Sequence, residues 1–132
     1  MIQKIRKSFC ILLVAIAVCS NASAKPKEAG SVMKALLITG GCCHDYKEQR
    51  EVIPMSIDMH SKQKIEWTIL HQRTANGSFE LDFYKNPDWA KGYDVVVHNE
   101  CFPNIGDPEY IESILKPHRE GVPAVLVHCT MH

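Results

Sequence analysis

The 132-residue sequence has no surplus of charge, because 15 lysine and arginine residues balance 15 aspartate and glutamate residues. A protein that binds nucleic acid through the phosphate backbone carries a basic surplus or a basic stripe, and this sequence has neither. Internal repeats and low-complexity segments are also missing, while 45% of the residues are apolar and 23% are charged. This composition excludes a disordered or collagen-like chain and predicts at most one globular domain.

A long apolar run is absent except near the start of the chain. Three basic residues lie within the first seven positions, residues 9–18 are apolar, and Ala22-Ser23-Ala24 follows. This order is typical of a secretory signal peptide. The run is shorter than the roughly 20 residues of a membrane-spanning helix. We therefore predict a cleaved signal peptide over residues 1–24 and a secreted or periplasmic chain without a membrane span, with an uncleaved anchor as the alternative.

Removal of the predicted signal peptide changes both the charge and the cysteine count. It leaves 12 basic residues against 15 acidic ones, a net charge of −3. Two of the six cysteines are also removed. Export implies an oxidising compartment, in which four cysteines allow three complete pairings. The remaining cysteines are Cys42, Cys43, Cys101 and Cys129.

Four short apolar segments alternate with stretches that have helical features or turn-forming residues. Such segments are typical of buried strands in a parallel sheet. Residues 25–32 before them are predicted to be a linker, and residues 71–92 are predicted to be mostly loop. The predicted strands are residues 33–39, 65–70, 93–98 and 122–127.

Two helices are predicted between these strands. The first covers residues 46–61, and Pro54 is expected to kink or split it. The second begins at Asp107, which suits the N-cap, and continues with Pro108 in the first turn. Its apolar face is expected to contain Ile111, Ile114 and Leu115. The order of strands and helices predicts an α/β domain with a parallel sheet covered by helices on both faces.

Polar and reactive side chains follow three of the four predicted strands. They occupy residues 40–46, 98–102 and 128–132. Because the carboxyl ends of parallel strands lie at one edge of the sheet, where ligands bind, we expect these clusters to line one cleft. The candidate catalytic residues are His44, Asp45, Glu100, His128 and Cys129. The candidate ligand-binding residues are Gly40, Gly41, Tyr46, Asn99 and His132.

The glycines and cysteines of the first cluster allow more than one role. Gly40-Gly41 either presents backbone N–H groups to an anion or forms a tight turn. Cys42 and Cys43 either bind a metal, pack as small thiols, or provide a disulfide partner for Cys101. The thiol and disulfide interpretations are favoured over the metal.

Acid and base groups occur in the first and second clusters. His44 and Asp45 either form an acid/base pair, or Asp45 caps the following helix. Glu100 is a candidate general base if it is buried beside His98 or His128, and otherwise it is a solvated loop acid.

The last cluster offers a nucleophile or a histidine. Cys129 at a sharp turn after a strand is a candidate nucleophile, and His128 is the alternative residue to face the cleft. Consecutive strand residues face opposite ways, so only one of the two is expected to point in. We assign no metal site and no cofactor, although a divalent metal bound by His128 and His132 is an alternative.

Residues 35–46 (ALLITGGCCHDY), 93–97 (YDVVV) and 121–132 (GVPAVLVHCTMH) resemble the ThuA-like (trehalose-utilisation) family. The resemblance covers most of the mature chain. It implies the class I glutamine amidotransferase-like fold, which is a flavodoxin-like three-layer sandwich with a parallel sheet. It also implies a role in carbohydrate metabolism.

The turn at the end of the chain resembles the family in part. Cys129-x-x-His132 is similar to the Cys-x-Gly-His turn of the related amidotransferases, with Met131 in place of the glycine, and His128 matches a histidine common in ThuA-like members. The glutaminase triad also needs a His and a Glu beyond this turn, so glutaminase activity is not expected. The resemblance implies that residues 33–132 are the N-terminal part of a ThuA-like domain, truncated after the fourth strand. A complete small domain with an exposed edge strand is the alternative.

These observations lead to one main functional hypothesis and two alternatives. The main hypothesis is a secreted ThuA-like domain that acts on or binds a sugar or sugar derivative. Tyr46, Trp67 and Phe102 are candidates to stack on a sugar ring. The first alternative is a non-catalytic binding or interaction domain without a complete active site. The weaker alternative is a metal-dependent hydrolase.

Overall fold

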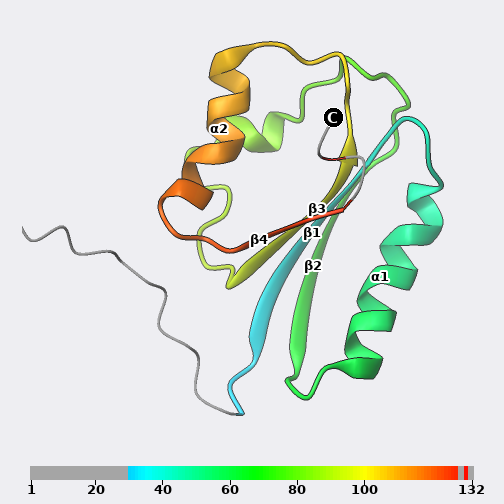
Figure 1. Ribbon diagram of the computed structural model, residues 1–132, viewed down its shortest axis with the longest axis vertical. Coiled ribbons are helices and arrows are strands. Elements are labelled where there is room, and N and C mark those ends of the chain that lie inside the picture. Colours follow the sequence, from blue (N-terminus) through cyan, green and yellow to red (C-terminus); the bar gives the residue numbers. More distant parts are fainter. Residues whose placement is uncertain (1–29, 128–129, 131–132) are drawn as a thin grey trace, which may run out of the picture.

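The computed structural model describes residues 30–127 and residue 130, and its strands form one parallel sheet. The order across the sheet is β2-β1-β3-β4, so the chain crosses from one side of β1 to the other (Figure 1). The predicted signal peptide lies outside the described residues, as do the candidates His128, Cys129 and His132. The strands are β1 (Met33–Gly41), β2 (Ile65–Gln72), β3 (Val95–Cys101) and β4 (Ala124–Leu126).

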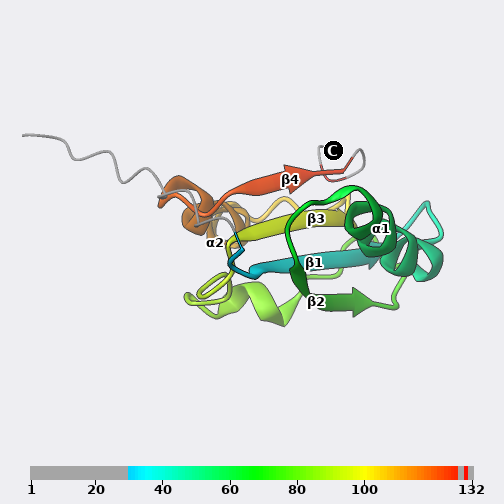
Figure 2. The same ribbon diagram turned by 90° about the horizontal axis from the view of Figure 1, so that it is seen from below.

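Helices cover the two faces of this sheet. The helix α1 (Tyr46–His60) packs against β1 and β2 on one face. On the other face lie α2 (Pro108–Arg119) and the short 3-10 helix η1 (Asp82–Lys85), which contact each other (Figures 1 and 2). The predicted α/β class, a flavodoxin-like sandwich with a parallel sheet, is confirmed. In the described part of the chain, no helix is both long enough and apolar enough to cross a membrane.

The core forms around β1 because this strand has neighbours on both edges and cover on both faces. Leu36 and Ile38 point toward η1 and α2, where they pack with Tyr84, Trp89 and Tyr110. The strand positions between them point toward α1, because successive side chains alternate between the faces of a sheet. Each large apolar side chain buried in this way contributes about 1.5–3 kcal/mol to stability.

The strands β1 and β3 extend further than the sequence predicts. β1 continues through Gly41, and β3 begins at Val95 and continues through Cys101. The predicted start of the third strand at residue 93 is wrong. Asp94 instead makes two hydrogen bonds with Lys34: Lys34 N donates to Asp94 Oδ2, and Asp94 N donates to the carbonyl oxygen of Lys34. The extension at the other end places Asn99 and Glu100 within a strand rather than after it.

The two predicted helices are present, with two corrections. α1 passes through Pro54 without a break, so the predicted splitting is wrong. The ring of Pro54 is buried. Packing of α1 against the sheet compensates for the backbone hydrogen bond that is lost because proline has no N–H group. In α2 the cap is confirmed, since Asp107 Oδ1 accepts a hydrogen bond from Glu109 N at 3.0 Å. Its predicted apolar face is partly wrong: Tyr110 is buried, whereas Ile111 and Leu115 remain exposed.

The fourth strand was expected to be buried over residues 122–127, and that prediction is wrong. β4 comprises Ala124–Leu126, and its side chains are exposed, with Val125 at 50% and Leu126 at 54%. Its apolar sequence cannot distinguish a covered strand from an edge strand. In the described residues it pairs with β3 alone.

Substitution of Gly41 by Ala is expected to lower the free energy of unfolding by more than about 2 kcal/mol. Gly41 has φ +102°, and a Cβ atom there would lie 2.0 Å from the carbonyl oxygen of Cys101. Urea denaturation measures the change, with Gly106→Ala as the control because a Cβ at Gly106 meets nothing within 4 Å. Equal stability of the two variants would contradict this account of the β1–β3 contact.

Candidate functional site

The alternation of side chains along β3 divides the predicted cleft into two sites. Asn99 points toward α1, where its Nδ2 donates to Thr39 Oγ1 at 3.2 Å and to Gln49 Oε1 at 3.0 Å. His98 and Glu100 point to the opposite face, beside η1 and α2. The single cleft expected from the sequence is therefore two sites, one on each face of the sheet.

The first site is a basic pocket of about 530 Å³ at the carboxyl ends of β1 and β2. It lies beside the first turns of α1. Of the predicted site residues, it contains Gly41, His44, Asp45 and Tyr46. The other lining residues are Lys47, Arg50, His71, Gln72 and Arg73, which sequence reasoning did not select.

The charge of the basic pocket is positive. Lys47, Arg50 and Arg73 contribute cationic side chains, and the N-terminus of α1 adds the positive end of the helix dipole. Asp45 is the one acidic lining residue, and its Oδ1 already accepts a hydrogen bond from Glu48 N at 3.0 Å. Asp45 is therefore the N-cap of α1, which is one of the two roles predicted for it.

Histidines in the basic pocket have different environments. His71 is partly buried, and this burial lowers its pKa, with the positive charges of Arg50 and Arg73 acting in the same direction. His44 is exposed, and its ring meets the ring of Tyr46 edge-on at 5.9 Å between centroids. Asp45 caps the helix through its Oδ1 atom, and the alternative His44–Asp45 acid/base pair stays a prediction.

The two glycines at the end of β1 allow close approach of the neighbouring strands. A Cβ atom on Gly40 would lie 2.3 Å from the carbonyl oxygen of Gln72, and one on Gly41 would meet Cys101. Only glycine fits these positions. Their structural role is therefore close packing of neighbouring strands, and the predicted anion contact stays a prediction.

The second site is a chain of buried polar groups on the other face of the sheet. Tyr84 Oη donates to Glu100 Oε1 at 2.5 Å, and the same Oε1 lies 2.8 Å from His98 Nδ1. His98 Nε2 lies 3.0 Å from His118 Nε2. His118 Nδ1 donates to the carbonyl oxygen of Val122 at 2.8 Å.

The direction of these bonds follows from the last one. Because His118 donates from Nδ1, a neutral His118 accepts at Nε2, so His98 donates from its own Nε2. Tyr84 Oη also lies 3.3 Å from His98 Nδ1, so Tyr84, His98 and Glu100 form one cluster around Glu100 Oε1. His98 Nδ1 and Glu100 Oε1 are therefore within hydrogen-bond distance in a buried environment, which is the geometry that general acid/base catalysis requires.

Glu100 also faces a small, mostly apolar pocket. Its volume is about 230 Å³, and Thr130 and the hydroxyl-bearing side chains of Tyr84 and Tyr110 contribute its other polar groups. Glu100 is 7% exposed, and its second oxygen, Oε2, is buried and has no hydrogen-bond partner among the described residues. The burial beside His98 is what the general-base hypothesis needs, whereas a solvated loop acid is excluded.

Burial and charge shift the acidity of the groups around Glu100. Burial, followed by the charge of Glu100, raises the pKa of Tyr84 well above its usual value. Burial also raises the pKa of Tyr110 to about 12, and it lowers the pKa of His118. Tyr84 and Tyr110 are therefore neutral hydrogen-bond donors at neutral pH. The sequence carried no local signal for Tyr84, which lies in a predicted loop.

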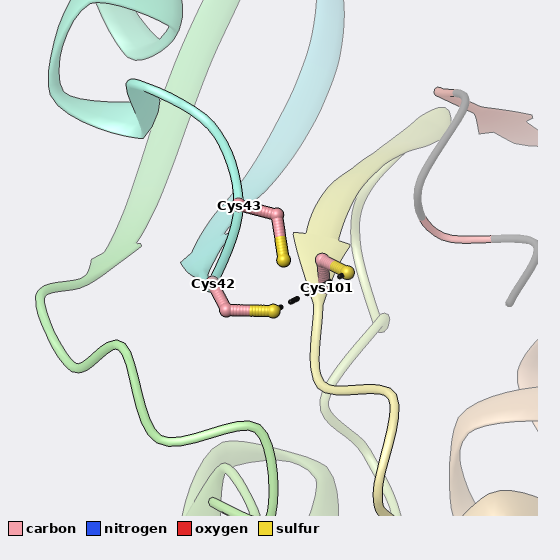
Figure 3. A group of neighbouring side chains, drawn as sticks. All are labelled: Cys42, Cys43 and Cys101. Atoms are coloured by element: carbon pink, nitrogen blue, oxygen red, sulfur yellow. Dashed lines mark hydrogen bonds between the residues drawn. The ribbon is translucent and has the colours of Figure 1, made fainter.

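The three described cysteines gather where β1 and β3 end. Cys42 Sγ lies 3.9 Å from Cys101 Sγ, which is a thiol hydrogen-bond distance rather than the ~2.05 Å of a disulfide. Cys43 Sγ belongs to the same cluster (Figure 3). Of the two favoured interpretations, the structure therefore contains thiols and not a disulfide to Cys101.

The aromatic candidates for sugar stacking lie in different places. Tyr46 lines the basic pocket, and Phe102 lines the pocket beside Glu100. Trp67 is a lining residue of neither pocket, and its Nε1 donates to Asp58 near the end of α1. Of the three, Trp67 is therefore removed as a candidate.

We expect the free energy of unfolding to fall as the pH drops below about 6.5. The pKa of folded His118 is lowered, so the unfolded chain binds more protons in this range and acid favours unfolding. Urea denaturation between pH 7.5 and 5.5 measures the slope, which should be smaller in His118→Asn than in the wild type. The exposed His60, replaced in the same way, is the control. Equal slopes in His118→Asn and the wild type would refute this assignment.

A comparison of the chain with protein-family models, with curated proteins and with solved structures finds no match. The α/β fold therefore stands on the structure itself. The resemblance to the ThuA-like family stays a prediction.

Proposed function

We propose that this chain is a ligand-binding α/β domain whose basic pocket holds a sugar derivative with an anionic group, such as a sugar phosphate or a sugar acid. The observation that carries the proposal is the position of three cationic side chains and a helix N-terminus around one cavity. The cavity volume of about 530 Å³ lies within the range of ligand pockets. Its place at the carboxyl ends of parallel strands is where open α/β sheets bind ligands.

The basic pocket has groups for both parts of such a ligand. Lys47, Arg50 and Arg73 suit a phosphate or a carboxylate, because charge-assisted hydrogen bonds are the stronger ones. Gln72 suits hydroxyl groups: its Oε1 accepts from the backbone of residues 73 and 74, which leaves its Nε2 as a donor. The predicted role in carbohydrate use and the predicted export agree with this ligand class. The carbohydrate role, the export and the ligand class are all proposals.

The proposal predicts that a sugar phosphate or sugar acid binds more tightly than the corresponding neutral sugar. Arg73→Gln and Lys47→Gln should each lower the affinity for the charged ligand by about tenfold, which corresponds to the loss of one charge-assisted hydrogen bond. Titration calorimetry with a panel of charged and neutral sugars measures this. Lys62→Gln removes the same charge at the opposite end of β2 and is the matched control. Equal binding of charged and neutral sugars, or wild-type affinity in both pocket variants, would defeat the proposal.

A second candidate function is proton transfer by Glu100 on a small substrate in the adjoining pocket. The specific observation is the buried Oε2, for which the described part of the chain offers no hydrogen-bond partner, while Oε1 contacts Tyr84 and His98. A carboxylate held in this way is oriented toward a proton donor in the pocket. This candidate would make the chain an enzyme, whereas the basic pocket alone fits a non-catalytic binding domain.

Glu100→Gln keeps the shape of the side chain and removes its basicity. If Glu100 is the base, this variant should lose about 100-fold or more in turnover of keto-sugars or disaccharides. Glu112→Gln, on the exposed side of α2, is the control. A substrate that both variants convert at the wild-type rate would exclude Glu100 as the base. The metal-dependent hydrolase alternative rested on His128 and His132, which lie outside the described residues.

A further inference from the structure

We propose that Cys42, Cys43 and Cys101 form a binding site for one soft metal ion, Zn²⁺ or Cu⁺. Thiolates are the ligands that select these ions. None of the three cysteines is among the lining residues of the basic pocket or of the pocket beside Glu100. The inference therefore goes beyond the proposed function and does not depend on it.

The distances between the sulfur atoms suit a single ion. All three Sγ atoms lie within 4.8 Å of one another, and those of Cys42 and Cys101 are 3.9 Å apart. A tetrahedral ion with metal–sulfur bonds of about 2.3 Å needs sulfur atoms about 3.8 Å apart. Small rotations of the Cys43 side chain, which is exposed, are enough to complete the set.

The backbone holds the sulfur atoms together before any ion binds. Cys42 N donates to the carbonyl oxygen of Cys101 at 3.1 Å, so the segment after β1 is fixed to the end of β3. Gly41 permits this contact, because any larger residue would collide with Cys101. Figure 3 shows Cys42 and Cys43 on one segment and Cys101 on the other, with the sulfur atoms close to one another between them.

The backbone of Cys43 is unusual in a way that supports a site. Its φ is +86°, and Cys43 is the one non-glycine residue with positive φ in the described part of the chain. Side-chain-bearing residues rarely adopt this conformation, and such residues concentrate at ligand-binding positions. This conformation occurs just after the end of β1, where the Cys43 sulfur atom lies in the cluster.

The burial of the three residues gives the ion a defined side of entry. Cys101 is 4% exposed, Cys42 is half-buried and Cys43 is exposed. An ion reaches the site from the side of Cys43 and is then held against the interior by the other two. Three protein ligands leave a fourth tetrahedral position for water or a substrate atom, as in catalytic rather than structural zinc sites. Cu⁺ would instead use the three thiolates alone.

The test uses the full chain, purified without added metal and kept reduced by a phosphine. Zn²⁺ and Cu⁺ are titrated separately against a chromophoric chelator, and the expected result is one ion per chain. Cys42→Ser and Cys43→Ser should each weaken binding by at least about tenfold, since even groups that merely support a metal ligand contribute that much. Circular dichroism confirms that each variant is folded, and the exposed Cys43 keeps the test valid if Cys42→Ser is unstable.

Two further measurements make the result decisive. Co²⁺ in place of Zn²⁺ should give a thiolate charge-transfer band that weakens in each variant, a readout that is independent of any activity. Cys129→Ser is the matched control, and it should bind the ion as the wild type does. Absence of binding to the reduced chain, or binding that depends on Cys129 and not on Cys42 and Cys43, would overturn the proposal. Neither result would affect sugar binding in the basic pocket.

Discussion

The pairing of β1 with β3 is the contact on which both sites and the cysteine cluster depend. It places Gly41 opposite Cys101, closely enough that no side chain fits between them. Residues almost 60 positions apart in the sequence thereby become neighbours. The loop after β1 then starts from a fixed point, so the first turn of α1 and the sulfur atoms of Cys42 and Cys43 have defined positions. A slip of this pair by one residue would move every side chain to the wrong face.

The same pairing separates the polar residues of β3. Asn99 joins the face of α1, while His98 and Glu100 join the face of η1 and α2. The basic pocket gathers cationic side chains at the edge of the sheet, whereas Glu100 is buried against Tyr84 and His98. These are different chemical environments, since a buried carboxylate depends on its hydrogen-bond partners and an exposed cation pocket depends on its summed charge.

Much of the fold follows from sequence patterns that act locally. The apolar strands, the Asp107 cap and the glycines at the end of β1 each have a local physical cause, and the structure contains all of them. The errors concern features that local patterns do not determine. Pro54 stays within α1 because packing compensates for its missing hydrogen bond, and β4 is exposed because nothing in the described residues covers it.

The sequence by itself determined the α/β class, the parallel sheet and the collection of polar residues at the carboxyl ends of the strands. Tertiary structure alone decided which of those residues meet. Arg73 and Lys47 come together across β2 and α1, and Tyr84 reaches Glu100 from a segment predicted to be loop. The physical reason is that secondary structure depends on neighbours in the chain, while a site depends on the register and face of strands that pair over long distances.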